Sequence, residues 1–177
     1  GPRVWSTATF EHDSRGRVDR VVDPLGNATT YGYNGTWGYL SSVNPPLANN
    51  TTTVVVDPKW GAQTSVTAPN SQTTTVTYDG LGRVSTVRNP GAPKVSTSFH
   101  YWPDPSRAAP AMLEVRTLRE PNASSWEYLS TWTFHDGFGR PIQTQSPAAT
   151  AGNRVITSTD FDNVGAVYRQ SGPQQFS

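Results

Sequence analysis

The sequence predicts an all-β protein in which tandem hairpins of about 22 residues form one continuous, strongly twisted and curved antiparallel sheet. The first reason is composition, because 23 Thr and 17 Val occur together with 15 Gly and 15 Pro. Thr and Val are stiff side chains that suit extended strands, whereas Gly and Pro interrupt helices and form turns. The second reason is an alternation of period two in the expected strands, and the third is a spacing rule that recurs along the chain.

The spacing rule links an acidic residue, a glycine and a proline. In the clearest copy, Asp79 lies three positions before Gly82, and Gly82 lies eight positions before Pro90. Three further copies obey the same rule and start at Asp13, Asp136 and Asp162. Degenerate copies with one extra residue in the first turn occupy 33–45 and 56–69, and a heavily altered copy spans 99–121. The repeat therefore predicts about seven equivalent units.

Each unit is expected to contain two strands and two turns. In the clearest copy, Val76 and Tyr78 alternate with Thr residues, as in a half-buried strand. Residues 79–82 predict a tight turn, because Asp bonds to the backbone of its own turn and Gly accepts a positive φ. Val84 and Val87 are three positions apart, which predicts a β-bulge or a local twist in the second strand. A proline turn leads to the next unit, and hairpins must pair edge to edge because one alone buries too little surface.

The domain organisation follows from this repeat. Residues 3–177 are expected to form a single array, since no shift in composition marks a boundary. A loop insertion is expected near 102–112, where the spacing of the repeat widens and two prolines stand close together. Gly1 and Pro2 resemble the remnant of a cleaved affinity tag.

Composition also excludes several classes of function. The chain contains no Cys, so thiol nucleophiles, disulfides and cysteine-based metal sites are excluded. The formal net charge is only +1, so there is no electrostatic argument for a nucleic-acid partner. No apolar run reaches the ~20 residues that a membrane-spanning helix needs. No metal, cofactor or membrane span is predicted.

The motif Tyr78-Asp79-Gly80-Leu81-Gly82-Arg83-Val84, together with the turn Asp23-Pro24-Leu25-Gly26-Asn27, resembles the Rhs or YD-repeat family. The Tyr-Asp pair is literal only at 78–79; it becomes His-Asp at 12–13 and 135–136 and Phe-Asp at 161–162. In that family, which includes bacterial polymorphic toxins, toxin-complex B–C cocoons and teneurins, the repeats form a β-strip that spirals into a hollow shell. The resemblance implies a secreted or cell-surface bacterial protein, non-catalytic, that encloses or displays a passenger such as a toxin domain. Its partners would be flanking repeats of the same polypeptide and that passenger.

The candidate site residues are those of the repeated turn. Since the acids recur once per unit, each is expected to cap its own turn rather than to join a catalytic pair or a calcium site. The arginine after each turn glycine is expected to pair with that acid or to stack on a neighbouring aromatic ring. His12 and His135 occupy the slot of Tyr78, which favours a structural role over metal binding. The turn signature comprises Asp13, Gly16, Arg17, Asp79, Gly82, Arg83, Asp136, Gly139, Arg140, Asp162 and Gly165.

An alternative function is left open by the aromatic residues. Trp37, Trp60 and Trp102 lie in expected turns or loops, where an exposed indole can stack on a sugar ring. The alternative is therefore a carbohydrate-binding or adhesin module. An open sheet also has two unprotected edges, so edge-to-edge self-association with another copy is expected.

Overall fold

The structure is a computed structural model that describes residues 6–103, 110–122, 125–150 and 152–176. These residues form strands and turns, with no helix among them. The strands are β1 (Thr9–His12), β2 (Val18–Val22), β3 (Ala28–Tyr33), β4 (Leu40–Asn44), β5 (Thr52–Asp57), β6 (Ala62–Thr67), β7 (Thr73–Tyr78), β8 (Val84–Arg88), β9 (Thr97–Trp102), β10 (Ala111–Asn122), β11 (Ser125–His135), β12 (Pro141–Pro147), β13 (Arg154–Phe161), β14 (Val167–Gln170) and β15 (Gln174–Phe176).

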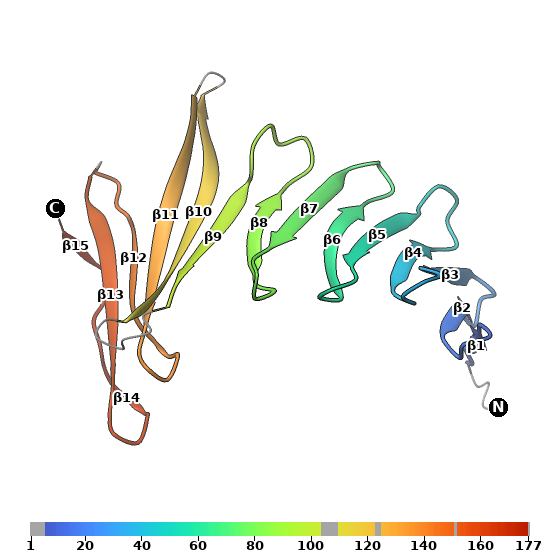
Figure 1. Cartoon of the computed structure of the whole chain (residues 1–177), viewed down its shortest axis with the longest axis horizontal. Helices are drawn as coiled ribbons and strands as arrows, with labels where there is room; N and C mark the ends of the chain where they lie inside the picture. Colours follow the sequence, from blue (N-terminus) through green and yellow to red (C-terminus); the bar gives the residue numbers. More distant parts are fainter. Residues whose placement is uncertain (1–5, 104–109, 123–124, 151, 177) are drawn as a thin grey trace, which may run out of the picture. The chain divides into compact units, whose positions relative to one another are not determined.

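The 15 strands belong to one open sheet in which strand order follows chain order from β1 to β14, while β15 pairs with β13 (Figure 1). Neighbouring strands run antiparallel, as in β1–β2 and β12–β13. The predicted all-β fold class is therefore confirmed. The chain divides into two compact units, which are Gly1–Gly82 with Arg88–Pro93, and Arg83–Val87 with Lys94–Ser177.

A β-bulge recurs near the turn of the hairpins, at the second or third residue of the second strand. In the first hairpin Glu11 pairs with Arg20 and His12 pairs with Val18, so Asp19 is left over. The same skip falls at 41, 64, 142 and 168 in the hairpins β3–β4, β5–β6, β11–β12 and β13–β14. The bulge that a spacing of three predicts is thus confirmed where the same spacing occurs as Val18 and Val21 and as Leu40 and Val43. It increases the local twist next to each turn.

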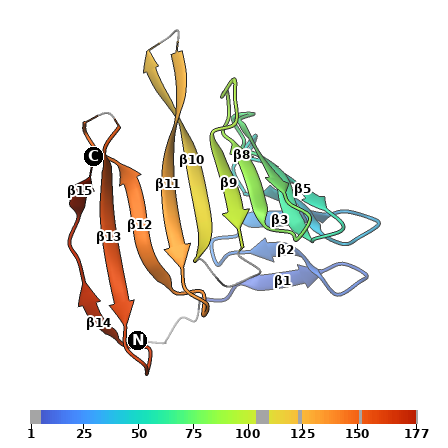
Figure 2. The ribbon, with the colours of Figure 1, turned by 60° about the vertical axis from the view of Figure 1, so that its left-hand side comes forward.

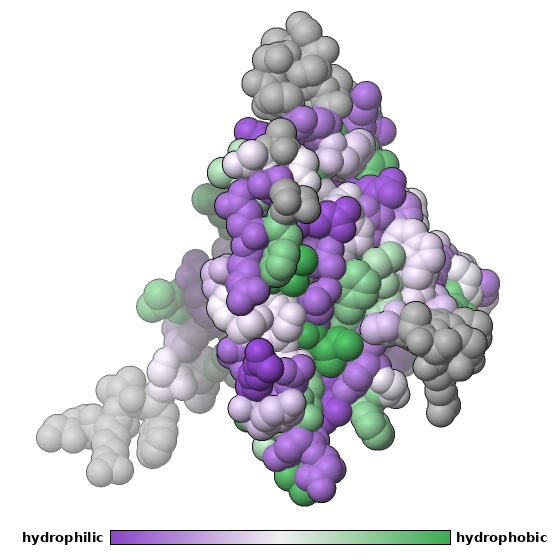
Figure 3. All heavy atoms as spheres, turned by 90° about the vertical axis from the view of Figure 1, so that its left-hand side faces the viewer, coloured by the Kyte–Doolittle hydropathy of each residue, from purple (hydrophilic) through white to green (hydrophobic). Residues whose placement is uncertain are grey.

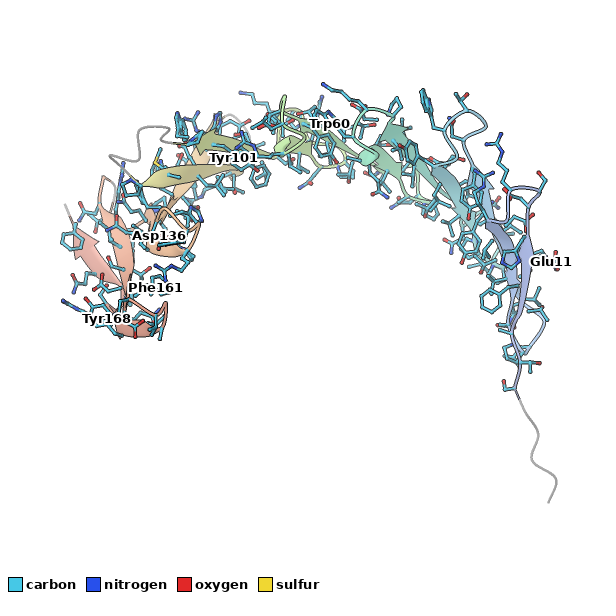
Figure 4. The ribbon with its side chains drawn as sticks, turned by 60° about the horizontal axis from the view of Figure 1, so that its bottom comes forward. Glu11, Trp60, Tyr101, Asp136, Phe161 and Tyr168 are labelled. Atoms are coloured by element: carbon cyan, nitrogen blue, oxygen red, sulfur yellow. The ribbon has the colours of Figure 1, made fainter. Side chains whose placement is uncertain are left out.

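In the described parts of the chain, the sheet is a single layer without a hydrophobic core. Among the described residues no hydrophobic side chain is buried, and the two buried residues are Ser96 and Glu114. Side chains project from both faces of the ribbon (Figure 4). On the side of the C-terminal unit presented in Figure 3, apolar residues are scattered among polar ones. The sheet is therefore held by ladder hydrogen bonds and contacts between neighbouring hairpins rather than by a second layer.

The hairpin β10–β11 in the C-terminal unit departs from the repeat. Its strands have 12 and 11 residues, and they extend beyond the ends of β9 and β12 (Figure 2). The loop insertion predicted near 102–112 falls between the end of β9 at Trp102 and the start of β10 at Ala111. Its residues 104–109 lie outside the described residues, as do Gly1 and Pro2.

Candidate functional site: the repeated turns

The turn at Asp13 shows how the signature residues act together. The Asp13 Oδ1 atom accepts hydrogen bonds from the backbone amides of Arg15 (2.8 Å) and Arg17 (3.0 Å). The Oδ2 atom accepts from Arg17 Nε at 2.8 Å and from Arg17 Nη2 at 2.5 Å. Gly16 has a φ of 77°, and its amide donates to the Asp13 carbonyl at 3.0 Å. The carboxylate is therefore fully engaged by its own turn.

The other signature turns have the same geometry. Asp136 Oδ1 accepts from the amides of Phe138 and Arg140, both at 2.9 Å, and Asp136 Oδ2 accepts from Arg140 Nε at 2.7 Å. The Asp79 and Asp162 carboxylates accept from the amides two residues on, at 2.9 and 3.0 Å. The turn glycines all have positive φ: 78° at Gly82, 77° at Gly139 and 87° at Gly165. At Asp162 the position of the arginine is taken by an alanine, whose amide still donates to Oδ1 at 2.8 Å.

The arginine of one turn also reaches the next hairpin. The Arg17 guanidinium lies 4.2 Å from the centre of the Tyr33 ring, and the Arg140 guanidinium lies 4.3 Å from the centre of the Phe161 ring. Arg83 likewise lies 4.1 Å from the Tyr101 ring. In each case a cation–π contact joins the turn to the first strand of the following hairpin.

The tyrosines of these first strands add a second link between hairpins. Tyr33 Oη donates to the Val18 carbonyl at 2.6 Å, and Tyr101 Oη donates to the Val84 carbonyl at 3.1 Å. Tyr78 Oη, in the literal Tyr-Asp pair, donates to the Gln63 carbonyl at 2.7 Å. The Tyr-Asp pair thus has two structural tasks, since the tyrosine ties to the previous hairpin and the aspartate closes its own turn.

Turn glycines also accommodate the side chain of the preceding turn. A Cβ atom at Gly38 would lie 2.9 Å from Arg17 Nη1, and one at Gly82 would lie 2.8 Å from Trp60 Cε3. In the C-terminal unit a Cβ atom at Gly165 would lie 3.2 Å from Arg140 Nη1. These glycines are therefore required for their backbone conformation and for the close approach of a planar side chain.

The turn contacts lower the pKa values of Asp13 and Asp136. The Arg17 side-chain hydrogen bonds lower the pKa of Asp13 from 3.8 to about 2. At Asp136, partial burial raises the pKa, but hydrogen bonds from the Arg140 amide and guanidinium outweigh it and the net pKa is lowered. Both carboxylates are held in their charged form by groups of their own turn. Neither has the raised pKa expected of a general acid.

Sequence reasoning missed that the inter-unit turn at Asp23 is built in the same way. Asp23 Oδ1 accepts from the amides of Leu25 and Asn27, both at 2.8 Å, and Oδ2 accepts from the Asn27 side chain at 2.8 Å. Asn27 therefore replaces the arginine of the signature turn, and its side-chain hydrogen bond lowers the pKa of Asp23. The available signal was the shared Asp-x-x-Gly spacing of 23–26, where Gly26 also has a positive φ of 85°.

The three histidines lie on three different strands. His12 and His135 end β1 and β11, and His100 in β9 stacks on Trp102 with ring centres 5.6 Å apart. Within the described ranges no group of three or more His, Asp or Glu side chains is arranged to hold a metal ion.

The three tryptophans singled out for glycan stacking have different surroundings. Trp60 is 38% exposed, lies against Gly82 and carries the Lys59 ammonium 4.5 Å from its ring centre. Trp102 is 44% exposed and stacked on His100. Trp37 is 61% exposed and lines a shallow pocket of about 140 Å³ with Tyr39 and residues 54–56. Trp37 and Trp60 directly precede a turn glycine, the slot filled elsewhere by the exposed Leu81, Phe138 and Val164.

A buried carboxylate in β10 had no signal in the repeat pattern. Glu114 is 4% exposed and forms an ion pair with Arg116, with 2.9 Å between Oε2 and Nη2. Burial raises the pKa of Glu114, but hydrogen bonds from Arg116 and Ser130 outweigh it, so that the net pKa is lowered. The group stays charged and is paired within its own sheet face.

A family model described as RHS Repeat matches residues 59–93, which contain the turn at Asp79 and its glycine. This match confirms the predicted resemblance to the Rhs/YD-repeat family for that stretch of the chain. No curated protein matches the sequence. The described part of this Rhs chain contains no helix long and apolar enough to cross a membrane.

Solved structures share the fold of this Rhs chain. The TcdB2-TccC3 crystal structure aligns with a TM-score of 0.77 and 17% identity, over 95% of this chain and 11% of that one. TcdB2-TccC3 without its hypervariable C-terminal region gives 0.76 and 13% identity, over 95% and 13%. A mutant Tc holotoxin pore of Photorhabdus luminescens gives 0.50 and 12%, over 95% and 10%. The Rhs chain thus spans about a tenth of the length of these solved chains, and it has the fold of a segment of them.

Proposed function

We propose that this Rhs chain is a non-catalytic wall segment of a secreted or surface-exposed bacterial protein, in which the β-strip encloses or displays a passenger domain. The observation that carries the proposal is the single-layer sheet. It has no hydrophobic core among the described residues. The carboxylates of Asp13 and Asp136 accept hydrogen bonds from residues of their own turns. Such a sheet exposes both of its faces, and it can be lengthened by adding further hairpins at its ends. The fold shared with TcdB2-TccC3 supports this role.

The wall role is tested by protease protection in the natural full-length protein. Trypsin is added to the intact protein and to its isolated passenger segment, and the cleavage rate of that segment is compared. A wall segment is expected to slow cleavage in the intact protein at least about tenfold, because the enclosed chain is reached only after local opening. Equal cleavage rates in the two samples would contradict the proposal.

A pair of glycine variants tests whether this segment takes part in the protection. Gly82→Val places a branched side chain at a positive φ and against Trp60, whereas Gly80→Ala enters open space at an ordinary φ. We expect protection to fall in the first variant and to persist in the second. Full protection in a Gly82→Val protein would mean that this stretch of the strip is not part of the wall.

Glycan binding is a second candidate, and the exposed indole of Trp37 beside its pocket is the observation that favours it. A pyranose ring stacked on this indole would contact Tyr39 at the same time. Affinity electrophoresis in polysaccharide gels tests this function. Retardation that Trp37→Ala abolishes and Trp60→Ala retains would support it, while unretarded migration of the wild-type chain in every gel would remove it.

A further inference from the structure

The hairpin β10–β11 has a free hydrogen-bonding edge. The two strands pair regularly without a bulge from Ala111 opposite His135 to Arg119 opposite Glu127. On its other side, β11 pairs with β12 only from Trp132 to His135. β12 ends at Pro147, and the chain then turns back, with the Ala148 amide donating to the Asn153 carbonyl. Among the described residues, no strand lies beside the outer edge of 127–131.

The opposite side of the same hairpin is covered. Beyond the end of the β9 ladder, the Leu118 amide donates to the Ser96 carbonyl at 2.8 Å. Tyr128 Oη reaches across and donates to the Val95 carbonyl at 2.8 Å. Residues 95–96 therefore close the β10 side, whereas the β11 side stays open where the hairpin projects (Figure 2).

This edge has few of the features by which proteins protect exposed strands, since its one charged residue, Glu127, is already paired with Arg119. Protected edges are short, bulged, or carry Pro or Lys. The terminal strands β1 and β14 fit this description, since each has four residues and a register shift beside its turn. Residues 127–131 contain no Pro and no Lys, and Tyr128 and Leu129 are 39% and 37% exposed.

We propose that the free edge of β11 is an interaction surface for the same edge of a second copy of this chain. Antiparallel pairing about Leu129 places Leu129 opposite its equivalent, Tyr128 opposite Ser130, and Glu127 opposite Thr131. No like charges face each other in this register, and Glu127 is already paired with Arg119, with 3.5 Å between Oε1 and Nη1. The pairing continues the β10–β11 ladder across a two-fold axis and joins two hairpins into a four-stranded sheet.

The interface is small, so the dimer is expected to be weak and dependent on concentration. Five residues per strand bury far less than the ~1,200 Å² of stable complexes, which points to dissociation constants on the order of tens of micromolar. This inference rests on the geometry of the C-terminal unit alone and does not depend on the wall role.

Sedimentation equilibrium of the 177-residue chain between about 1 and about 200 μM tests the proposal. The wild type is expected to dimerise, and Leu129→Lys is expected to weaken the dimer at least about tenfold, because two like charges then meet at the two-fold axis. Val55→Lys is the matched control, since Val55 is 59% exposed and belongs to β5, a strand that takes no part in the proposed pairing. Phe10→Lys reports on pairing through the terminal strand β1.

A charge-swap experiment separates pairing from a structural defect. Leu129→Lys and Leu129→Glu are expected to be monomeric separately and to associate when mixed in equal amounts, because opposite charges then meet at the axis. A monomeric wild type at about 200 μM would overturn the proposal. It would also be overturned if Leu129→Lys dimerised like the wild type, if Phe10→Lys abolished the dimer, or if the mixture stayed monomeric.

Discussion

The contact between Trp60 and Gly82 allows the two roles of a turn glycine to be measured separately. In Gly82→Ala, the new Cβ atom takes a φ of 78°, which costs about 1–2 kcal/mol for an L-residue. The same atom would lie 2.8 Å from Trp60 Cε3, so the indole must move, at a further cost of about 1–3 kcal/mol. The unfolding free energy is therefore expected to fall by about 2–5 kcal/mol in total.

Two control variants isolate these contributions within the same compact unit. Gly16→Ala has a nearly equal φ of 77° but no atom within 4 Å of its Cβ, so it is expected to lose only about 1–2 kcal/mol. Gly80→Ala has open space and no positive φ, and is expected to be neutral or stabilised by up to about 1 kcal/mol. Urea unfolding followed by tryptophan fluorescence gives the three values. Equal losses in Gly82→Ala and Gly16→Ala would refute the claim that Trp60 packs against this turn.

Three further predictions follow from the turns and from β10. The pKa of Asp13 is about 2 in the folded chain and 3.8 in the free group. The ionised carboxylate therefore stabilises the fold above about pH 4, and this stabilisation is lost as the pH falls through about 2. A carboxyl ¹³C titration should give a midpoint of about 2 for Asp13 in the wild type and a higher midpoint in Arg17→Gln. Tyr33→Phe keeps the ring under Arg17 and removes the bond to the Val18 carbonyl, so urea unfolding should show a loss of about 0.5–1.5 kcal/mol, and an unchanged midpoint would argue against that bond. Glu114→Gln leaves the Arg116 guanidinium without its charged partner, so the unfolding free energy should fall by about 1–3 kcal/mol in the same assay. The control Glu127→Gln changes an exposed ion pair, so the unfolding free energy should fall by less than about 1 kcal/mol.

The sequence was sufficient to predict the hairpins because their turns depend on local chemistry. Each turn needs an aspartate that accepts hydrogen bonds from the amides two and four residues ahead, and a glycine at positive φ. All of these groups lie within five consecutive residues. The valine spacing similarly revealed the bulge, because a skipped residue shifts the side-chain alternation within one strand. Strand order also followed, since each hairpin has only its chain neighbours to pair with.

Contacts between successive hairpins were not predictable to the same degree. Arg17 lies over Tyr33, and Trp60 lies against Gly82, only because the twist of the sheet brings one turn beside the next. The intervals between such partners vary, with 16 residues from Arg17 to Tyr33 and 21 from Arg140 to Phe161 by residue number. Glu114 and the free edge of β11 were missed for a different reason. Both belong to the elongated hairpin, where the repeat spacing no longer applies.

The pairing of each hairpin with its sequence neighbours has a consequence for evolution of the chain. A globular domain that gains or loses 20 residues must rebuild its interior, but the described part of this chain has no buried apolar interior to rebuild. Inserting or deleting one whole hairpin would leave every other ladder intact, provided that the arriving turn supplies a planar side chain for the next glycine. Such a strip can therefore change in length by recombination between its own repeats, with only the two junctions under selection.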